Sequence, residues 1–256
     1  MIGIKAFLNK FNIYQYIALF LAVLNISSAL FYGFGILSLL PVLTAVLTAS
    51  IFDLTINYFK TKSFAAPYSA IISGLFIGGL LAQNLPFYVY AAAGIIATAS
   101  KHIIKIQQRH IFNPANFGVL LVSVIFGAAH SWWIASPLVL MILLGIFVVW
   151  KLKRFDLAIS FLMAHFLINI IFNFSILKDF NELYLFIVNS RIIIFFSMFM
   201  LIEPKTHPQG RKKRIIYGIA VAILLMIFDK IIPIHDLPLA LAVGNVFVPV
   251  LNRIKF

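Results

Sequence analysis

The sequence contains no cysteine and very few acidic residues. Among its 256 residues there are seven Asp or Glu against 20 Lys or Arg. The absence of cysteine excludes disulfide bonds, iron–sulfur clusters held by cysteine, and haem attached through thioethers. We therefore expect no iron–sulfur cluster, whereas a flavin, a quinone or an ion stays compatible with the chain.

Charge of either sign is scarce, and apolar side chains dominate. Charged residues make up 11% of the chain and hydrophobic residues 63%, whereas soluble domains are nearer one quarter charged and one half apolar. A water-soluble fold of this length could not bury so much apolar surface. The apolar runs are also continuous and do not alternate with polar residues as barrel strands do. The composition predicts an all-α polytopic membrane protein.

Long apolar segments divide the chain into about ten expected transmembrane helices, since a spanning helix needs roughly 20 mostly apolar residues. The loops between them are short, which predicts a single integral membrane domain over residues 1–256. The ten segments are 14–34, 36–59, 66–83, 86–104, 114–129, 134–152, 157–177, 185–202, 215–228 and 237–251.

The positive charge is concentrated in alternate loops. All Lys and Arg except Lys178, Arg191 and Lys230 fall in one set of loops or near the termini, and the positive-inside rule places that set in the cytoplasm. We therefore expect both termini in the cytoplasm and the chain in the cell (inner) membrane. The net charge of +13 is then a topology signal with contacts to anionic lipids, and we expect no binding to nucleic acid.

Ten spans divide into two halves of five. Because each half has an odd number of spans, the second half would be inverted relative to the first. We place these inverted halves at about 14–130 and 134–252. Such repeats position functional sites near the midplane, at short or broken helices. The fifth and tenth segments correspond in the two halves, and both are interrupted: one begins with Asn113 and Pro114, the other contains Asn245 and Pro249. We expect these two segments to be partners.

A polar stretch, RHIFNPANFGVLL, lies near the middle of the chain. Pro114 suits the first turn of a helix, and Asn113 before it is a favourable N-cap. The N–H groups and dipole at such a helix start favour an anion or a carbonyl-rich ring, and Arg109 and His110 add donors. Asn116 lies one turn further along. The alternative is a purely structural cap at the membrane surface.

A second polar cluster, Glu-Pro-Lys-Thr-His-Pro, follows the eighth segment. Glu203 lies at the expected cytoplasmic edge of the membrane, where a carboxylate is costly unless it is paired or functional. It could be an interfacial group paired with Lys205 or Arg211, or part of a site together with Thr206. The basic run at 211–214 is a topology anchor.

The seventh segment carries a polar stripe. His165, Asn169 and Asn173 are spaced by four residues, so they share one face of a helix. Polar residues at membrane depth usually face the interior of the bundle. They could line a path for an ion or a proton, or they could hold helices together by hydrogen bonds.

Small residues mark the third segment. Gly74 and Gly78 form a small-xxx-small pair in PYSAIISGLFIGG, which predicts close helix packing. Ser69 and Ser73 are explained equally well by packing.

Four segments together resemble the RnfD/NqrB family of membrane subunits of electron-transport complexes. They are PYSAIISGLFIGGLL, SKHIIKIQQRHIFNPANFGVLL, FFSMFMLIEPKTHPQGRKKRIIYGIAVAIL and LALAVGNVFVPVLNR, and they extend over residues 67–253. The chain looks closer to short members named after enediyne-biosynthesis clusters than to the full-size subunits. The resemblance implies ten helices in two inverted halves, similar to urea transporters, and other membrane subunits as partners.

The resemblance also implies a flavin. Typical members bind flavin mononucleotide covalently through a threonine between the fifth and sixth helices. The corresponding stretch here, GAAHSWWIASP at 127–137, has no threonine. Covalent flavin mononucleotide is therefore not expected, and non-covalent flavin mononucleotide or riboflavin is. We assign no catalytic residue and no metal ligand. The candidate cofactor-binding residues are Arg109, His110, Asn113, Asn116, Glu203, Thr206 and Asn245.

Two functions follow from these observations. The first is an integral membrane subunit of an electron-transport complex, coupled to Na⁺ or H⁺ movement and binding a non-covalent flavin. The second is a transporter or channel for a small solute or ion built on the same inverted-repeat fold. Its path would run along the stripe of the seventh segment, His165, Asn169 and Asn173.

Overall fold

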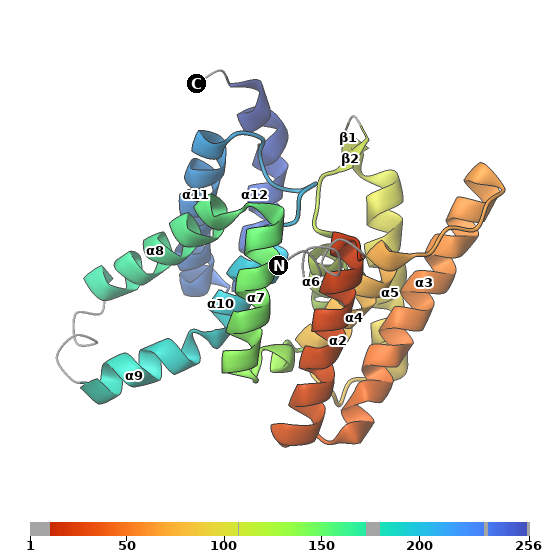
Figure 1. The fold of residues 1–256 in the computed structure, drawn as a ribbon, viewed down its shortest axis with the longest axis horizontal. Helices are drawn as coiled ribbons and strands as arrows, with labels where there is room; N and C mark the ends of the chain where they lie inside the picture. Colours follow the sequence, from red (N-terminus) through yellow and green to blue (C-terminus); the bar gives the residue numbers. More distant parts are fainter. Residues whose placement is uncertain (1–10, 107, 173–179, 233–234, 255–256) are drawn as a thin grey trace, which may run out of the picture.

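The protein is almost entirely helical (Figure 1). The computed structural model describes residues 11–106, 108–172, 180–232 and 235–254. The elements are α2 (Ile13–Phe31), η1 (Ile36–Ser38), α3 (Leu39–Thr61), α4 (Tyr68–Leu80), α5 (Phe87–Ile103), β1 (Lys105–Ile106), β2 (Arg109–His110), α6 (Pro114–Phe126), η2 (Trp133–Ala135), α7 (Leu138–Leu152), α8 (Phe155–Phe172), α9 (Phe180–Asn189), α10 (Arg191–Phe195), η4 (Phe196–Met200), α11 (Arg211–Ile231) and α12 (Asp236–Arg253).

Each expected apolar segment contains helix, and the helix ends follow local signals. Asn12 and Gln15 form a capping box at the start of α2, where each side chain accepts a hydrogen bond from the other residue's N–H. At the other end of the first half, α6 stops at Gly127, whose φ of 65° terminates the helix in the left-handed region. The eighth segment begins earlier than expected, at Phe180, and is broken near Ser190.

Few of the helices can cross a membrane by their own length and apolar character. Within the described residues three do so: α2, the continuous unit Ile36–Thr61, and α8. The pair Phe180–Asn189 and Arg191–Met200, bent by 44°, makes a fourth if it is one span. By contrast α4 and α6 have 13 residues each, or about 20 Å at 1.5 Å per residue, which is short of a hydrocarbon core of about 30 Å. The multi-pass membrane class is confirmed, while ten spans stay a prediction.

The first half is packed through small residues. A Cβ added at Gly74 would lie 2.4 Å from Val46 Cα, and one at Gly78 would lie 2.5 Å from Val42 Cα. The backbones of α3 and α4 are therefore in direct contact, which confirms the predicted close packing of Gly74 and Gly78.

Two glycine contacts are built alike, one between α5 and α3 and the other between α11 and α8. Gly94 is the eighth residue of α5 and Gly218 the eighth of α11. A Cβ at Gly94 would lie 2.7 Å from the Thr48 hydroxyl of α3, and one at Gly218 would lie 2.4 Å from the Ser160 hydroxyl of α8. In both cases that hydroxyl donates to the carbonyl three residues earlier in its own helix.

The outer part of the second half is loosely packed. Helix α9 and the C-terminal end of α8 project outward in Figure 1, while the rest of α8 packs against α11. Of the described residues of α9 none is buried, and α8 buries only Leu157, Ala158 and Phe161. The tight contacts of this half are those of α11 with α8 and α12.

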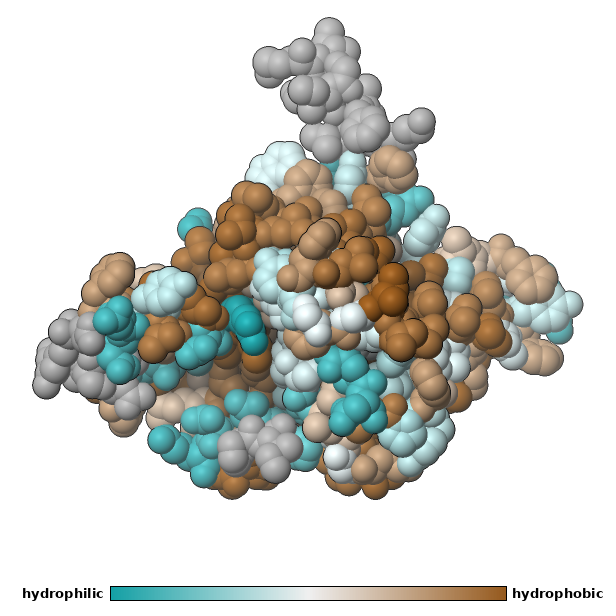
Figure 2. Space-filling model, turned by 90° about the horizontal axis from the view of Figure 1, so that it is seen from below, coloured by the Kyte–Doolittle hydropathy of each residue, from teal (hydrophilic) through white to brown (hydrophobic). Residues whose placement is uncertain are grey.

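Apolar side chains cover much of the outside. Figure 2 shows broad brown areas lying directly on the surface of one face. Along α3, exposed leucine and isoleucine side chains recur every three or four residues at Leu40, Leu43, Leu47 and Ile51, so they form one outward stripe. A stripe of this kind would be a liability in water and suits contact with lipid.

Candidate functional site

The polar stretch begins with a short hairpin and a capped helix. Strands β1 and β2 pair antiparallel, Lys105 opposite His110 and Ile106 opposite Arg109. The chain then reaches Asn113, whose side-chain oxygen accepts from the Asn116 N–H at 3.1 Å, with Pro114 as the first residue of α6. The predicted N-cap is confirmed.

The two segments predicted to be interrupted meet at this cap, although α12 runs unbroken from Asp236 to Arg253 with Pro249 inside it. The Asn113 N–H donates to Asn245 Oδ1 of α12 at 3.1 Å. The Asn245 amide nitrogen donates to the Thr206 carbonyl at 2.9 Å and to the Tyr217 hydroxyl at 2.8 Å. Asn245 is completely buried, and all these groups are out of reach of water, so each bond satisfies a group that would otherwise be costly.

Arg109 and His110 connect the hairpin to the loop after η4. The Arg109 guanidinium donates to three carbonyls, those of Pro204 at 2.6 Å, Lys205 at 3.1 Å and His207 at 3.2 Å. His110 Nε2 lies 2.7 Å from Glu203 Oε1. Lys205 and Arg211 were the two partners predicted for Glu203. Neither forms an ion pair with it in the structure, because the His110 imidazole takes that place. Arginine suits this position because its planar fork reaches several oxygens at once.

The remaining candidates complete the same network. Thr206 Oγ1 donates to the Glu203 carbonyl at 3.4 Å. Asn116 Nδ2 donates to the Pro238 carbonyl of α12 at 2.8 Å, while its buried Oδ1 has no partner in the part of the chain described. The structure thus brings together all seven predicted cofactor-binding residues, although most of their donors and acceptors already satisfy one another. Their role towards a cofactor stays a prediction.

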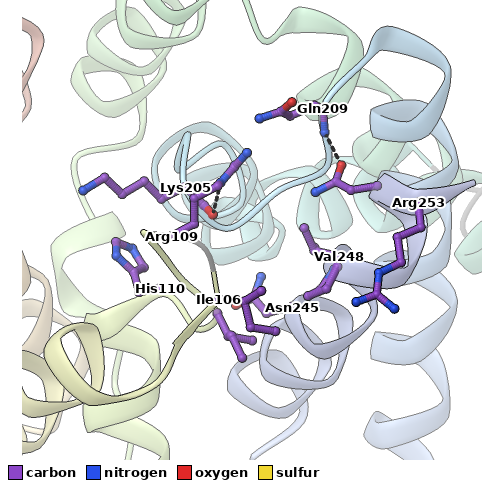
Figure 3. Close-up of a pocket in the computed structure, with 11 residues that line it drawn as sticks. Ile106, Arg109, His110, Lys205, Gln209, Asn245, Val248 and Arg253 are labelled. Carbon is purple, nitrogen blue, oxygen red and sulfur yellow. Dashed lines mark hydrogen bonds between the residues drawn. The ribbon is translucent and has the colours of Figure 1, made fainter.

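A cavity of about 330 Å³ opens beside this network. Figure 3 shows Arg109 and His110 on one side of it, with Lys205 above them, and Gln209 and Arg253 on the other side. Among the described residues its lining contains no carboxylate: the polar residues are cations, amides and His110, and the rest are apolar. They are Ile106, Arg109, His110, Ile111, Lys205, Gln209, Asn245, Val248, Pro249, Asn252 and Arg253.

The loop that carries Glu203 also contains a buried neutral histidine. His207 Nε2 accepts from Arg154 Nε at 2.8 Å, so its Nδ1 carries the proton and donates to the Pro208 carbonyl at 2.9 Å. Burial, together with the charges of Arg154, Arg214 and Arg109, lowers the pKa of His207 to about 4. The imidazole is therefore uncharged at neutral pH and links Arg154 to the Pro208 carbonyl through its two hydrogen bonds.

Sequence reasoning missed an ion cluster inside the first half. Asp53 of α3 is 3% exposed, and its Oδ1 lies 2.9 Å from Lys101 Nζ and 2.7 Å from His102 Nε2 of α5. The charges of Glu203 and Lys205 also act on Lys101. A single acid within an apolar run, SIFDLTIN, was the available signal, since such a residue needs a partner.

The stripe of the seventh segment lies away from this network. Asn169 Nδ2 lies 3.3 Å from His165 Nε2 and donates to the His165 carbonyl at 2.9 Å. Both bonds are within α8. Asn173 lies outside the described residues. A transport role for these residues stays a prediction.

The stretch expected to replace the flavin-bearing segment is built into the core. Trp133 Nε1 donates to the Gly78 carbonyl at 2.9 Å, and Trp132 and Trp133 are both buried. His130 pairs with Leu81 in an isolated bridge. These contacts attach residues 127–137 to α4.

Comparison with known proteins adds one match. A model of the NQR2, RnfD, RnfE family matches residues 8–138, which is 131 of the 256 residues, just over half of the chain. The matched region contains the hairpin, Asn113 and Asn116 and ends before Glu203 and Asn245. No curated protein matches the chain.

Proposed function

Because the chain belongs to the NQR2, RnfD, RnfE family of membrane subunits of electron-transport complexes, we propose that it binds a non-covalent flavin and serves electron transfer coupled to Na⁺ or H⁺ movement. Other membrane subunits are its partners. The single observation that carries the flavin part is the cavity beside Arg109, in which cations and amides converge with no carboxylate among the described lining residues.

The cavity fits part of a flavin in size and chemistry. Its volume, about 330 Å³, lies at the lower end of the range for ligand sites, so it suits a ring system or a phosphate-bearing tail. Arg109, Lys205 and Arg253 would hold a phosphate, and the Asn252 and Gln209 amides would bond ring oxygens and nitrogens. When bound, the flavin would supply one- and two-electron redox chemistry. Ile106, Val248 and Pro249 would exclude water from one side.

The test of the flavin proposal removes two positive charges that do not hold other parts of the fold together. Neither the Lys205 nor the Arg253 side chain has a hydrogen bond or ion pair in the described part of the chain. We expect the purified protein, co-expressed with its neighbouring subunits, to be yellow and to release flavin mononucleotide or riboflavin on denaturation. The variant Lys205→Gln with Arg253→Gln should lose most of a phosphorylated flavin. The matched control, Lys60→Gln with Lys62→Gln at the end of α3, should keep it.

Two outcomes would overturn the flavin proposal. One is a colourless protein with no extractable flavin, obtained with the partners present. The other is a flavin content that is equal in the cavity variant and in the control.

We propose that the fold consists of ten spans in two inverted halves, 14–130 and 134–252, with both termini in the cytoplasm of the cell membrane. The matched contacts of Gly94 with Thr48 and of Gly218 with Ser160 support this arrangement, since the same construction recurs at equivalent helices. The contact between α6 and α12 supports it too, because the fifth helices of two such halves meet near their shared axis.

One observation favours the alternative, a transporter or channel for a small solute or ion. The start of the short helix α6 faces Asn245 of α12, and the buried Asn116 Oδ1 beside this contact has no partner in the described residues. Flux of Na⁺, H⁺ or a small neutral solute in proteoliposomes containing this subunit alone would support it. Asn116→Leu should then reduce the flux, whereas Asn169→Leu should reduce it only if the path follows α8.

A further inference from the structure

A groove separate from the candidate cofactor cavity is lined by residues at the end of α7 and the starts of α8 and α11; Figure 1 labels these three helices. Its volume is about 890 Å³, more than twice that of the cavity beside Arg109. The lining residues are Trp150, Lys151, Lys153, Phe155, Asp156, Ile159, Ser160, Arg211, Arg214 and Ile215. None of them takes part in the network around Asn113.

One wall of the groove is apolar and exposed. Trp150 is 54% exposed, Phe155 41% and Ile159 52%. Trp150 and Phe155 lie within one turn of the ends of their helices, where tryptophan is favoured at the boundary between hydrocarbon and headgroups. The wall therefore meets the acyl region of the bilayer and the headgroup layer at once.

The rim of the groove carries more positive charge than the described residues neutralise. Helix α11 starts with four consecutive basic residues and has no acid in its first turn. This arrangement repels itself and opposes the positive end of the helix dipole. Asp156 neutralises Arg214, with Oδ2 2.6 Å from Nη2, but in the described part of the chain the exposed Lys153 and Arg211 have no ion-pair partner.

We propose that this groove is a specific binding site for one anionic phospholipid. Its phosphate lies between Lys153 and Arg211, and one acyl chain covers Trp150, Phe155 and Ile159. A zwitterionic lipid carries its own cation to the same rim and gains less. A free anion has no use for the exposed apolar wall. The site is independent of any flavin.

Tryptophan fluorescence offers a direct test. The chain has three tryptophans; Trp132 and Trp133 are 6% and 1% exposed, so Trp150 is the one open to lipid. The protein is placed in phosphatidylcholine nanodiscs containing a small, equal fraction of either phosphatidylglycerol or phosphatidylcholine brominated on the acyl chains. We expect brominated phosphatidylglycerol to quench several-fold more strongly, and Trp150→Phe to abolish that difference.

Matched charge variants locate the site. Lys153→Gln with Arg211→Gln should remove the preference for brominated phosphatidylglycerol, while Lys60→Gln with Lys62→Gln keeps it. Circular dichroism and thermal melting establish that each variant is folded. If the Gln variant is unstable, Lys153→Arg, which keeps the positive charge, should retain the preference.

Three results would overturn the proposal. The first is equal quenching by the two brominated lipids. The second is a preference that persists in Lys153→Gln with Arg211→Gln, since the attraction would then be diffuse. The third is loss of the preference on adding millimolar inorganic phosphate at constant ionic strength, which would make the groove a site for a free anion.

Discussion

Asn245 is the residue on which the candidate site depends most. Its side chain accepts from the Asn113 N–H and donates to the Thr206 carbonyl and the Tyr217 hydroxyl. Three elements, α6, α11 and the loop after η4, are therefore joined through one amide. No other standard side chain of this size offers both an acceptor and two donors; aspartate in its neutral form has only one donor.

We predict that Asn245→Leu is strongly destabilising. It would leave three buried polar groups without partners, at about 1–3 kcal/mol each, so the free energy of unfolding should fall by roughly 3 kcal/mol or more. The melting temperature in detergent reports this change. Asn169→Leu, which breaks bonds only within α8, is the matched control and should cost less than about 1 kcal/mol. Equal losses in the two variants would contradict the prediction.

His207 should make stability depend on pH. Its pKa is about 4 in the fold and about 6.5 when unfolded, so the unfolded chain binds the extra proton between these values. The contribution of the neutral His207 to the free energy of unfolding is complete above pH 6.5. It declines as the pH falls towards 4, by on the order of 3 kcal/mol. Melting temperatures of the protein and of His207→Gln across this range measure it. A drop of the same size in the variant would assign the effect to other groups.

At the scale of elements, the short helix α6 depends on direct backbone contact with α5. A Cβ at Gly118 would lie 2.5 Å from the Ala93 carbonyl oxygen, and neither backbone can move aside without shifting a whole helix. We predict that Gly118→Ala costs about 1–3 kcal/mol or more and lowers the melting temperature. At Gly145 the nearest atom is Met198 Sδ, at the flexible end of a side chain, so Gly145→Ala should be milder. The reverse order would refute the argument.

The sequence predicted the helices well because membrane helices are recognisable from their long apolar runs. It located α6 from Asn113 and Pro114, since the cap and the proline act locally. It could not place the ends of α4, where an unbroken apolar run continues past Leu80. The hairpin could not be predicted from the sequence either, because the two-residue strands at Lys105 and Arg109 carry no periodic pattern.

The candidate site could be predicted in its members and not in its connections. Polar residues within an apolar chain are conspicuous, and the seven that the sequence singles out lie close together in the structure. Their partners come from contacts such as His110 with Glu203, 93 residues apart, which no local rule fixes. Asp53 was missed because its partners Lys101 and His102 looked like an ordinary basic helix end.

At the scale of the whole molecule, the absence of cysteine makes the topology open to a clean test. We predict that single cysteines replacing Ser63, Gln209 or Lys153 react with a membrane-impermeant maleimide only after the cell membrane is permeabilised. Cysteines at Tyr32 or Asn84, in turns at the opposite ends of the helices, should react in intact spheroplasts. Reaction of Ser63→Cys in intact spheroplasts would place that loop outside and contradict the proposed orientation.

The bond between Asn113 and Asn245 also imposes an order on biosynthesis. The two residues are separated by 132 positions, so the ribosome completes α6 long before its partner exists. Until α12 has inserted, the Asn113 N–H and the Asn116 amide face the bilayer without the acceptors that α12 supplies, a condition that hydrocarbon penalises heavily. A nascent chain that stalls before α12 would expose this defect, and the insertion of α12 would supply the missing acceptors.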